Sequence, residues 1–524
     1  MPRPYLQQID SAISKPELSQ FNKAYFILHD QLNLNAWPDD IRDNDSLLIL
    51  MESREKGEEI PHHKVKAAYI LSCMRHFALE CREEGLNVLY HSTNGHFDDG
   101  LKELFDDFEG ELIYMQPSEW DTRERLGALE HEYGSIRQIE NSFFLCDLQE
   151  WVDKIETGYR IEYFYRVMRR RTGYLMVDKK PEGGEWNYDK QNRETIPKGL
   201  DIPEIPQFEP DEVTKEVVEM VQDYFPDHFG EVKSFGYAVT RSQALELLDD
   251  FIENRLDEFG PYEDALKTGN SKLFHSQLSL YMNNGLLHPK EVCDRAVEAY
   301  ENGDARLNSV EGFVRQIIGW REFIKIYYEA MMPDVREANH FGFKEKLPEM
   351  YWTGKTEMKC MEESLKPVIG EAYSHHIQRL MILSNFSNLT ETDPRELNKW
   401  FWFAYADAYE WVELPNVLGM STFADGGVLA SKPYVSSGNY INKMSDYCRN
   451  CKYSVTKKTG EKACPFNYLY WNFVDKQRET FNDSGRVNFM VSMFDNKKSD
   501  EEKEKIRSST ETFLSNLKRG YGDS

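Results

Sequence analysis

Four cysteines near the end of the chain have the residue type and the spacing of a metal site. Cys448 and Cys451 form a C-x2-C pair, Cys464 follows in K-A-C-P-F, and Cys360 lies far upstream in M-K-C-M-E. Two thiolates at this spacing can bind one metal centre from a single turn. Two more complete a four-sulfur ligand set, which suits zinc or an iron–sulfur cluster. Pro465, directly after Cys464, favours the second alternative, so we predict a [4Fe-4S] cluster.

The other cysteines lack such spacing and are interpreted as reduced core thiols. They are Cys73, Cys81, Cys146 and Cys293. Residues 1–20 contain no apolar targeting core, and no later run approaches the length of a membrane span. Reduced thiols, a metal centre and the lack of a targeting segment together predict a cytoplasmic protein that does not enter a membrane.

Length and charge restrict the class of protein without identifying its partner. A chain of 524 residues predicts about two to four domains. The net charge of -27 argues for an enzyme of small molecules rather than a general nucleic-acid binder. Locally the sign reverses, because Arg166 and residues 169–171 lie among tyrosines, and further basic residues surround the cysteines. Such runs could bind phosphates and stack bases, or form solvated helix faces.

The elements that must position these residues change character along the chain. From Lys23, segments of helical period alternate with short apolar runs, which are A-Y-F-I-L-H, S-L-L-I-L-M, N-V-L-Y-H and E-L-I-Y-M. Strands separated by helices predict a parallel sheet, so we expect residues 23–147 to form a Rossmann-like α/β domain. The chain has no G-x-G-x-x-G, which argues against an NAD site. The loop after the first strand nevertheless lies where open sheets bind ligands.

The remaining sequence divides into four parts. Residues 1–22 form an N-terminal extension, and residues 148–235 are basic and carry Gly and Pro, as a long interdomain connection would. Residues 236–500 repeat apolar groups with helical spacing, which predicts a large all-α domain. Residues 501–524 form a charged tail that begins as a helix.

Several motifs of the helical half, in order, resemble the cryptochrome/photolyase family. They are F-H-S-Q-L-S-L-Y, R-Q-I-I-G-W-R-E-F, H-H-I-Q-R-L-M-I and Y-A-D-A-Y-E-W-V-E-L-P-N. The four cysteines, Y-W-T-G-K-T and K-P-Y-V-S-S-G-N-Y-I-N resemble the iron–sulfur branch of this family, the prokaryotic (6-4) photolyases. So does Glu413, where many family members carry Asn. The resemblance runs from about Ala24 to beyond Cys464, and in combination these motifs are specific.

The resemblance implies an FAD site in the helical domain. In the family, an S-x-L-S run holds the FAD diphosphate, and an arginine and an aspartate pair across the isoalloxazine, where the guanidinium stabilises the anionic reduced flavin. Arg379 and Asp407 stand at those two positions, and Glu413 stands opposite N5. The implied flavin-binding residues are Phe259, His275, Ser276, Leu278, Ser279, Gln316, Trp320, Arg379, Asp407 and Glu413.

The resemblance also implies an activity, which is light-driven repair of UV-damaged DNA by a monomeric lyase. Excited reduced FAD would donate an electron to a (6-4) pyrimidine–pyrimidone lesion that is flipped out of the duplex. His376 matches the family's active-site histidine and would donate a proton to the lesion, since an imidazole readily gives and regains a proton near neutral pH. His375 is its neighbour, and Tyr434 and Tyr440 match tyrosines beside the lesion.

Two further features follow from the resemblance. Trp400, Trp352 and Tyr409 match candidates for the electron route that reduces FAD, while Phe401 stands where relatives carry Tyr and is too hard to oxidise. Leu380 replaces the methionine that other photolyases place against the flavin. The branch carries a 6,7-dimethyl-8-ribityllumazine antenna in its α/β domain, and the implied antenna residues are Asp30, Gln31 and Leu32.

Two other functions remain open at this stage. The same flavin protein could act as a cryptochrome-like blue-light photoreceptor without repair activity, because a fold does not fix a function. A third hypothesis is a DNA-binding protein whose cluster acts only structurally. His376, Tyr434 and Tyr440 favour repair.

Overall fold

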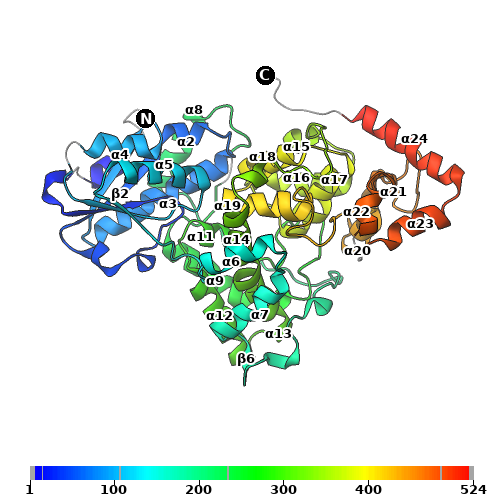
Figure 1. Ribbon diagram of the computed structural model, residues 1–524, viewed down its shortest axis with the longest axis horizontal. Helices are drawn as coiled ribbons and strands as arrows, with labels where there is room; N and C mark the ends of the chain where they lie inside the picture. The colour runs from blue at the N-terminus through cyan, green and yellow to red at the C-terminus, as the bar shows by residue number, and fades with distance from the viewer. Residues whose placement is uncertain (1–5, 14–15, 106–107, 233–234, 484–486, 518–524) are drawn as a thin grey trace.

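A five-stranded parallel sheet forms the N-terminal part of the computed structural model, which is drawn on the left of Figure 1. The structure describes residues 6–13, 16–105, 108–232, 235–483 and 487–517. The strands are β1 (Lys23–Ile27), β2 (Ser46–Ser53), β3 (Asn87–Thr93), β4 (Glu111–Met115) and β5 (Ile136–Ile139), in the spatial order β3-β2-β1-β4-β5. All neighbouring pairs are parallel, as the alternation of strands and helices predicts.

Both faces of the sheet are covered because successive side chains of a strand point to opposite sides. In β1, Tyr25 and Ile27 belong to the large core shared with the helical half, whereas Ala24 and Phe26 belong to a separate core. Helix α3 (Lys64–Glu83) contributes to the first core, and α4 (Phe97–Phe105) and α5 (Trp120–Glu132) contribute to the second. The four runs expected to be strands are strands, and β5 is an additional edge strand.

The segment expected to be an interdomain connection is folded rather than extended. It contains α6 (Gln149–Glu156), α7 (Ile161–Thr172), a small hairpin of β6 (Met176–Val177) and β7 (Lys180–Pro181), and α8 (Glu212–Tyr224). Helices α6 and α7 and the hairpin join the lower lobe of Figure 1, whereas α8 lies beside the sheet domain. A buried ion pair of Arg75 in α3 with Glu216 fixes α8 there.

Helices make up most of the second half. They are α9 (Arg241–Asn254), α10 (Leu256–Phe259), α11 (Ser279–Asn283), α12 (Pro289–Asn302), α13 (Leu307–Val314), α14 (Glu322–Met331), α15 (Met350–Thr353), α16 (Lys359–Glu371), α17 (Asn385–Leu389), α18 (Pro394–Ala404), α19 (Glu410–Leu414), α20 (Gly438–Met444), α21 (Pro465–Lys476), α22 (Arg478–Asp483), α23 (Phe489–Lys497) and α24 (Asp500–Asn516). The expected all-α domain is therefore present, and none of the described helices is both long and apolar enough to cross a membrane.

Three helical stretches have π rather than α hydrogen bonding, and each adjoins predicted site residues. They are η7 (Arg315–Arg321), η9 (Gln378–Ser384) and η10 (Pro415–Ser421). A π turn widens the helix and is frequent at functional sites. Gln316 lies in the first of these stretches and Arg379 in the second.

The two ends of the chain also have defined places. Helix α1 (Gln7–Ala12), in the expected N-terminal extension, buries Ile9 in the large core. Helix α24 begins with a capping box in which the Ser499 hydroxyl and the Glu502 carboxylate each accept a backbone N–H of the other's residue. Buried Ile506 fixes α24 on the second core of the helical half, so the charged tail is expected and found to begin as a helix.

Candidate active site and four-cysteine pocket

An arginine–aspartate pair occupies the centre of the predicted flavin site. The Arg379 guanidinium donates to the two carboxylate oxygens of Asp407 at 3.0 and 3.1 Å, and its Nε donates to the Ser374 carbonyl at 2.7 Å. Although burial opposes it, the Asp407 carboxylate raises the pKa of Arg379. Such a two-fold charge-assisted pair fixes the orientation of both groups.

The Asp407 carboxylate is fixed from the opposite side by α11. The Ser279 hydroxyl donates to it at 2.8 Å, and the Asn283 amide donates to the Asp407 carbonyl at 2.9 Å. Asp407 follows α18, which ends at Ala404, so the carboxylate stands on a loop between two helices of the all-α domain. Ser279, expected to hold the FAD diphosphate, is thus brought to Asp407 in this structure.

Three histidines gather beside this pair. The rings of His275 and His375 stack with centroids 4.5 Å apart and an interplanar angle of 18°. Burial, with neighbouring positive charges, lowers the pKa of His275 to about 3 and that of His375 well below its usual value. Within the described part of the chain, neither ring nitrogen of His375 has a hydrogen-bond partner. A half-buried and a buried neutral imidazole, each with a ring nitrogen that has no partner in the described chain, form a surface suited to a polar ligand.

His376 differs from its neighbour because its side chain is exposed to solvent. Desolvation by the surrounding protein atoms, and then the Arg379 charge, lower the pKa of His376 to about 4. The free protein therefore carries His376 as a neutral, accessible imidazole at pH 7.

The other predicted flavin residues surround this centre in different ways. Gln316 donates to the Glu263 carboxylate at 3.0 Å, and the Trp320 indole donates to the Asn416 amide oxygen at 2.9 Å. The Ser276 hydroxyl accepts the Leu278 N–H at 3.2 Å, and the Leu278 side chain is in the core. The ring of Phe259 packs edge-on against His275 at 5.8 Å.

Glu413 is the least satisfied of these groups. It is buried, and among the described residues neither carboxylate oxygen has a hydrogen-bond partner. Burial raises its pKa well above the ordinary value, although the charge of Lys66 acts in the opposite direction. A carboxyl group left in this state is paired by a ligand or holds a proton.

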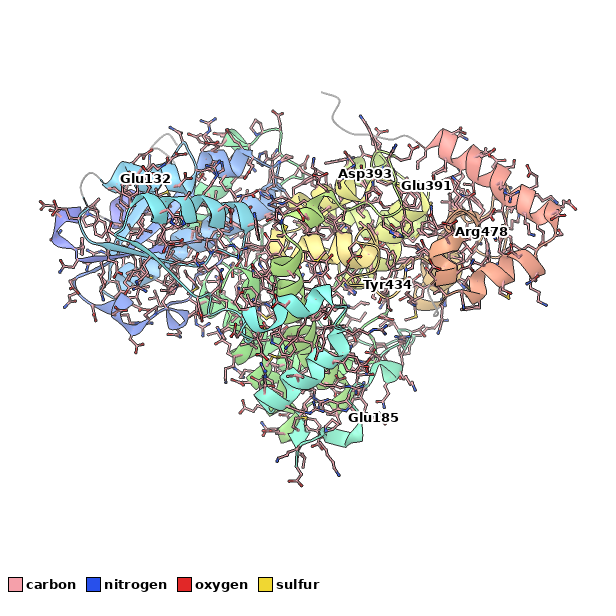
Figure 2. The ribbon with its side chains drawn as sticks, in the orientation of Figure 1. Glu132, Glu185, Glu391, Asp393, Tyr434 and Arg478 are labelled. Atoms are coloured by element: carbon pink, nitrogen blue, oxygen red, sulfur yellow. The ribbon has the colours of Figure 1, made fainter. Side chains whose placement is uncertain are left out.

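The two predicted lesion-side tyrosines are half-buried. The Tyr440 hydroxyl lies 3.5 Å from the Asp264 carboxylate, and the Lys432 ammonium lies 5.7 Å from the Tyr434 ring centre. In Figure 2, Tyr434 lies below the helices of residues 350–420, on the side toward the lower lobe.

All four predicted ligand cysteines line one pocket, here called the four-cysteine pocket. Its other lining residues are Met358, Gly438, Ile441, Tyr447, Tyr453, Pro465 and Phe466. Burial and then the three other thiols raise the pKa of Cys360, which places the four sulfurs within electrostatic reach of one another. No described set of His, Cys, Asp or Glu side chains has the geometry of a single-ion site. The four cysteines that the sequence analysis assigns to one metal site therefore lie around one pocket.

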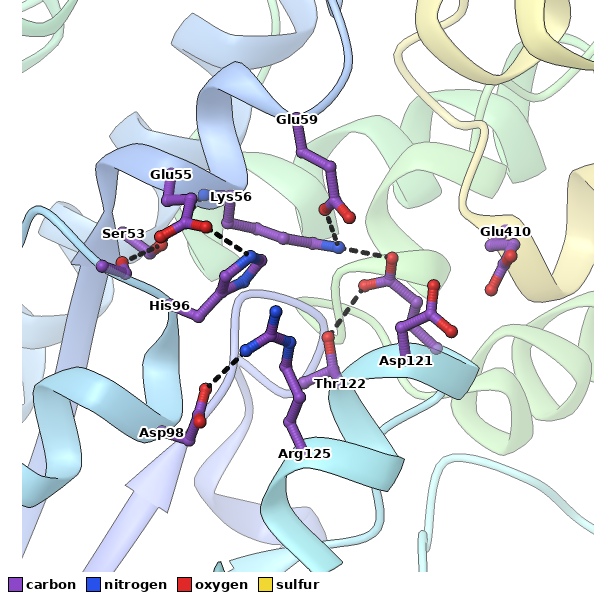
Figure 3. Close-up of polar contacts among 12 residues, drawn as sticks. Ser53, Glu55, Lys56, Glu59, His96, Asp98, Asp121, Thr122, Arg125 and Glu410 are labelled. Carbon is purple, nitrogen blue, oxygen red and sulfur yellow. Dashed lines mark hydrogen bonds and ion pairs between the residues drawn. The ribbon is translucent and has the colours of Figure 1, made fainter. Parts of the chain in front are cut away.

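A second pocket, here called the interdomain pocket, lies at the carboxyl edge of the sheet, where α/β folds place ligands. It is lined by Leu28, His29, Asp30, Lys56, His62, Lys66, Ile70, Pro117, Ser118, Glu119, Thr122, Trp402, Ala408, Tyr409, Glu410 and Trp411. Figure 3 shows the Lys56 side chain reaching toward Glu59. Its ammonium pairs with Glu59 at 2.9 Å and with Glu119 at 2.6 Å.

The three predicted antenna residues are not equivalent in this pocket. Asp30 lines it, and one of its buried carboxylate oxygens has no partner in the described ranges. Gln31 instead points into the sheet domain, where it donates to the Met115 carbonyl at 3.2 Å and accepts the Leu28 N–H. The Leu32 side chain is in the large core.

The aromatic residues predicted for electron transfer fall into two groups. Trp400 is fully buried, and its indole N–H donates to the Tyr351 carbonyl at 3.1 Å. Tyr351 directly precedes Trp352 in the chain. Tyr409 lies instead in the wall of the interdomain pocket, stacked on His29 at 5.7 Å. Tyr405, which sequence reasoning missed, lies between the Arg379 guanidinium at 4.2 Å and the Trp400 ring at 5.8 Å.

The basic run of α7 is divided among several contacts. Arg169 is buried and donates to backbone carbonyls, including that of Trp186 at 3.1 Å, and Arg171 forms a two-fold pair with Glu150. Arg170 is exposed and lies 4.8 Å from the Trp186 ring centre. Arg169 and Arg171 therefore fix the local fold, and the buried Arg169 differs from the solvated helix face that the sequence analysis offered as an alternative.

Lys66 is another functional candidate that sequence reasoning missed. It is 2% exposed, and its ammonium donates to the Trp402 and Ala408 carbonyls at 2.7 and 2.6 Å. Burial lowers its pKa to about 7. In the sequence it stands in an amphipathic helix like any surface lysine, so no local signal could have revealed it.

Comparisons with known proteins agree with this arrangement. A family model described as deoxyribodipyrimidine photo-lyase-related protein matches residues 25–237. A (6-4) photolyase of Agrobacterium fabrum is 44% identical over 472 residues, which cover 88% of this chain and 93% of that protein. The chain belongs to the photolyase/cryptochrome family.

Solved structures of the photolyase/cryptochrome family share the fold. A bacterial class III photolyase from Agrobacterium tumefaciens has a TM-score of 0.56 at 15% identity, covering 83% of this chain and 88% of that one. The cryptochrome of Synechocystis sp. PCC6803 has a TM-score of 0.58 at 11% identity, covering 94% of this chain and 100% of that one.

Proposed function

We propose that this protein is a (6-4) photolyase that repairs UV-damaged DNA under light. The observation that carries the proposal is the 44% identity to a (6-4) photolyase, together with the Arg379–Asp407 pair beside the histidine cluster. We also propose that it acts as a monomer in the cytoplasm.

FAD is the cofactor that these residues fit. Glu413 and His375 present buried polar atoms without partners in the described chain, and the Arg379–Asp407 pair is bound by Ser279 of α11. We assign flavin binding to the ten residues that the sequence analysis gives as implied by the family resemblance, among them Arg379, Asp407 and Glu413. Bound and reduced, FAD would supply the electron that light transfers to the lesion.

A [4Fe-4S] cluster fits the four-cysteine pocket better than one ion does. Four thiols share the pocket wall without forming a single-ion site among the described residues, and a cluster, in which each cysteine binds a different iron, holds its ligands farther apart. The assigned ligands are Cys360, Cys448, Cys451 and Cys464. The cluster would supply a strong cross-link between α16 and the loop before α21.

The interdomain pocket fits a flat polar chromophore, and we propose that it holds the lumazine antenna. Its wall offers the stacked rings of His29 and Tyr409 and the partly unpaired carboxylate of Asp30. Gln31 would act by fixing the loop that carries Asp30. Of the family's antenna residues, Asp30 is the one we assign to contact.

The chain's own chemistry at the lesion is proton transfer. Desolvation, and then the positive charge of Arg379, keep the His376 imidazole neutral until anionic DNA enters. A lesion phosphate would raise the pKa of His376, so that its imidazolium N–H can give a proton to the rearranging base. Tyr434 and Tyr440 would contact the flipped nucleotide.

The test is turnover of an oligonucleotide with one defined (6-4) lesion, in light and in darkness. Repair that depends on light supports the proposal. Flavin binding without repair of the lesion would show instead a photoreceptor of the same family, and absence of flavin would leave the DNA-binding alternative.

A further inference from the structure

Gln378 makes three hydrogen bonds between the histidine cluster and the four-cysteine pocket. Its amide oxygen accepts the His375 backbone N–H at 3.2 Å. Its amide nitrogen donates to the Tyr447 hydroxyl at 3.3 Å and to the Glu363 carbonyl at 3.3 Å. The side chain is fully buried, so these bonds are not in competition with water.

Both far ends of these bonds belong to the cysteine site. Tyr447 lines the four-cysteine pocket and precedes Cys448 in the chain. Glu363 stands on α16 one turn after Cys360, and its carboxylate accepts the Gly269 N–H at 2.8 Å. A change in the position of the cysteines therefore moves two of the groups that Gln378 binds.

The near end is the turn that carries His375 and His376. A glutamine that reaches back three residues to a free N–H fixes the start of a helix, as one half of a capping box does. His375 has no side-chain hydrogen bond among the described residues, so Gln378 and the stack on His275 determine its place. His376 is the next residue in the chain, so its position depends on that of His375.

A second contact leads to the lesion side through α20. A Cβ added to Gly438 would lie 2.8 Å from the Cys464 sulfur, and Ile441 lines the same pocket. The same helix carries Tyr440, and its last carbonyl, on Met444, accepts the Leu266 N–H at 2.9 Å. The four-cysteine pocket thus contacts α20, which carries Tyr440, and is connected through Gln378 to the turn that carries His375 and His376.

We propose that Gln378 is a positioning residue through which the occupied four-cysteine site fixes the His375–His376 turn. This inference rests on the proposed function, since it gives the metal site a task in lesion repair. Loss of the cluster would loosen the histidine turn and α20, while the Arg379–Asp407 pair, fixed by Ser374 and α11, would remain.

The test compares two tyrosines of the same pocket wall. Tyr447→Phe removes a hydroxyl that binds Gln378, whereas Tyr453→Phe removes one that lies 3.4 Å from the surface residue Glu357. Iron per chain is measured for both variants of the full-length protein. Amide hydrogen exchange is then followed in peptides that span residues 374–379.

We expect equal iron in the two variants and exchange at the His375 amide about fivefold faster in Tyr447→Phe alone, the effect of one lost hydrogen bond. Removing the cluster with a chelator should accelerate the same peptide in the wild type and add less in Tyr447→Phe, because one of the two bonds from Gln378 toward the cysteines is already lost and only the bond to the Glu363 carbonyl remains. Equal exchange in the two tyrosine variants would overturn the proposal, even if cluster removal unfolds the protein.

The exchange measurement separates this inference from the proposed function, because it needs neither lesion nor light. If the wild type has no repair activity, the proposed function is wrong, and hydrogen exchange still tests the link through Gln378. A repairing wild type in which Tyr447→Phe behaves as Tyr453→Phe refutes the link alone. Gln378→Ala provides a second check and should accelerate the same peptide at least as much.

Discussion

In the DNA-free protein, His376 binds a proton too weakly to serve as the proton donor to the lesion. Desolvation and the Arg379 charge hold its pKa at about 4, so the free protein carries a neutral imidazole at pH 7. We predict that the His376 ring signals, followed by NMR between pH 5 and 8, do not titrate in the DNA-free protein. A midpoint above pH 6 would contradict this environment.

Replacement of the same residue tests its chemistry. His376→Asn should retain flavin and lesion binding but slow repair by about 10²–10⁴-fold, the usual contribution of a positioned acid. His340→Asn is the control, because His340 is exposed and contacts Thr480 in another part of the molecule. Repair by His376→Asn at the wild-type rate would move the acid to His375 or a tyrosine.

Lys66 gives a prediction on stability. Its pKa is near 7 in the folded protein and near 10.5 when unfolded. Between these values the unfolded chain holds a proton that the folded chain lacks, so this lysine makes the unfolding free energy rise with pH, by up to about 1.4 kcal/mol per unit. Lys66→Met should remove that rise. Denaturant titrations at pH 7 and pH 9 check it, and parallel pH dependence in both proteins would refute it.

The cysteines could be predicted from their residue type and spacing, whereas Arg379 and Asp407 were predicted only through the resemblance of their motifs to a known family. Lys66 and Gln378 could not be found this way, because their importance lies in partners far along the chain, such as the Ala408 carbonyl and the Tyr447 hydroxyl.

Among the elements, the strands were predictable and the irregular helices were not. Each buried strand reads as an apolar run because both sheet faces are covered. The short β5 at the edge, with the pattern buried, exposed and two half-buried residues, gives no such run. The π turns leave the apolar spacing nearly unchanged, so the stretches that contain Gln316 and Arg379 could not be told from ordinary α-helix.

Helix α20 supports a prediction on packing. Gly438→Ala would place its Cβ 2.8 Å from the Cys464 sulfur and should destabilise the protein by about 1–3 kcal/mol, with a loss of iron. Gly370→Ala, in α16, is the matched control, since its Cβ would meet nothing within 4 Å. Thermal unfolding and iron content, measured on both variants, test this prediction. Normal iron content in Gly438→Ala would show that the packing of α20 does not support the ligand site.

Ligand removal tests the cysteines directly. Cys360→Ala and Cys448→Ala should each yield protein without a full cluster, because α16 and the loop before α21 are then no longer cross-linked. Cys293→Ala, a buried cysteine in α12, is the control and should keep its iron. Full iron and unchanged thermal stability in Cys360→Ala would show that this residue is not a ligand.

At the scale of the whole molecule, the charge of -27 opposes DNA binding everywhere except at local basic sites. Affinity for damaged duplex should therefore fall steeply with added NaCl and improve with a divalent cation, which reduces the repulsion. Fluorescence anisotropy at several salt concentrations measures this. An affinity that stays constant across salt would exclude phosphate contacts as its main source.

Helix α3 has a consequence for biosynthesis. The His63 N–H donates to the Phe403 carbonyl at 2.7 Å, and the Lys66 ammonium donates to the Trp402 and Ala408 carbonyls, which lie 336 and 342 residues later in the chain. A ribosome releases the sheet domain first, and domains tend to fold as they emerge. The start of α3, which binds the backbone around the Asp407 loop, would thus be folded before that loop is translated. A gene fragment that starts at residue 236 would encode the Asp407 loop without the α3 groups that bind it.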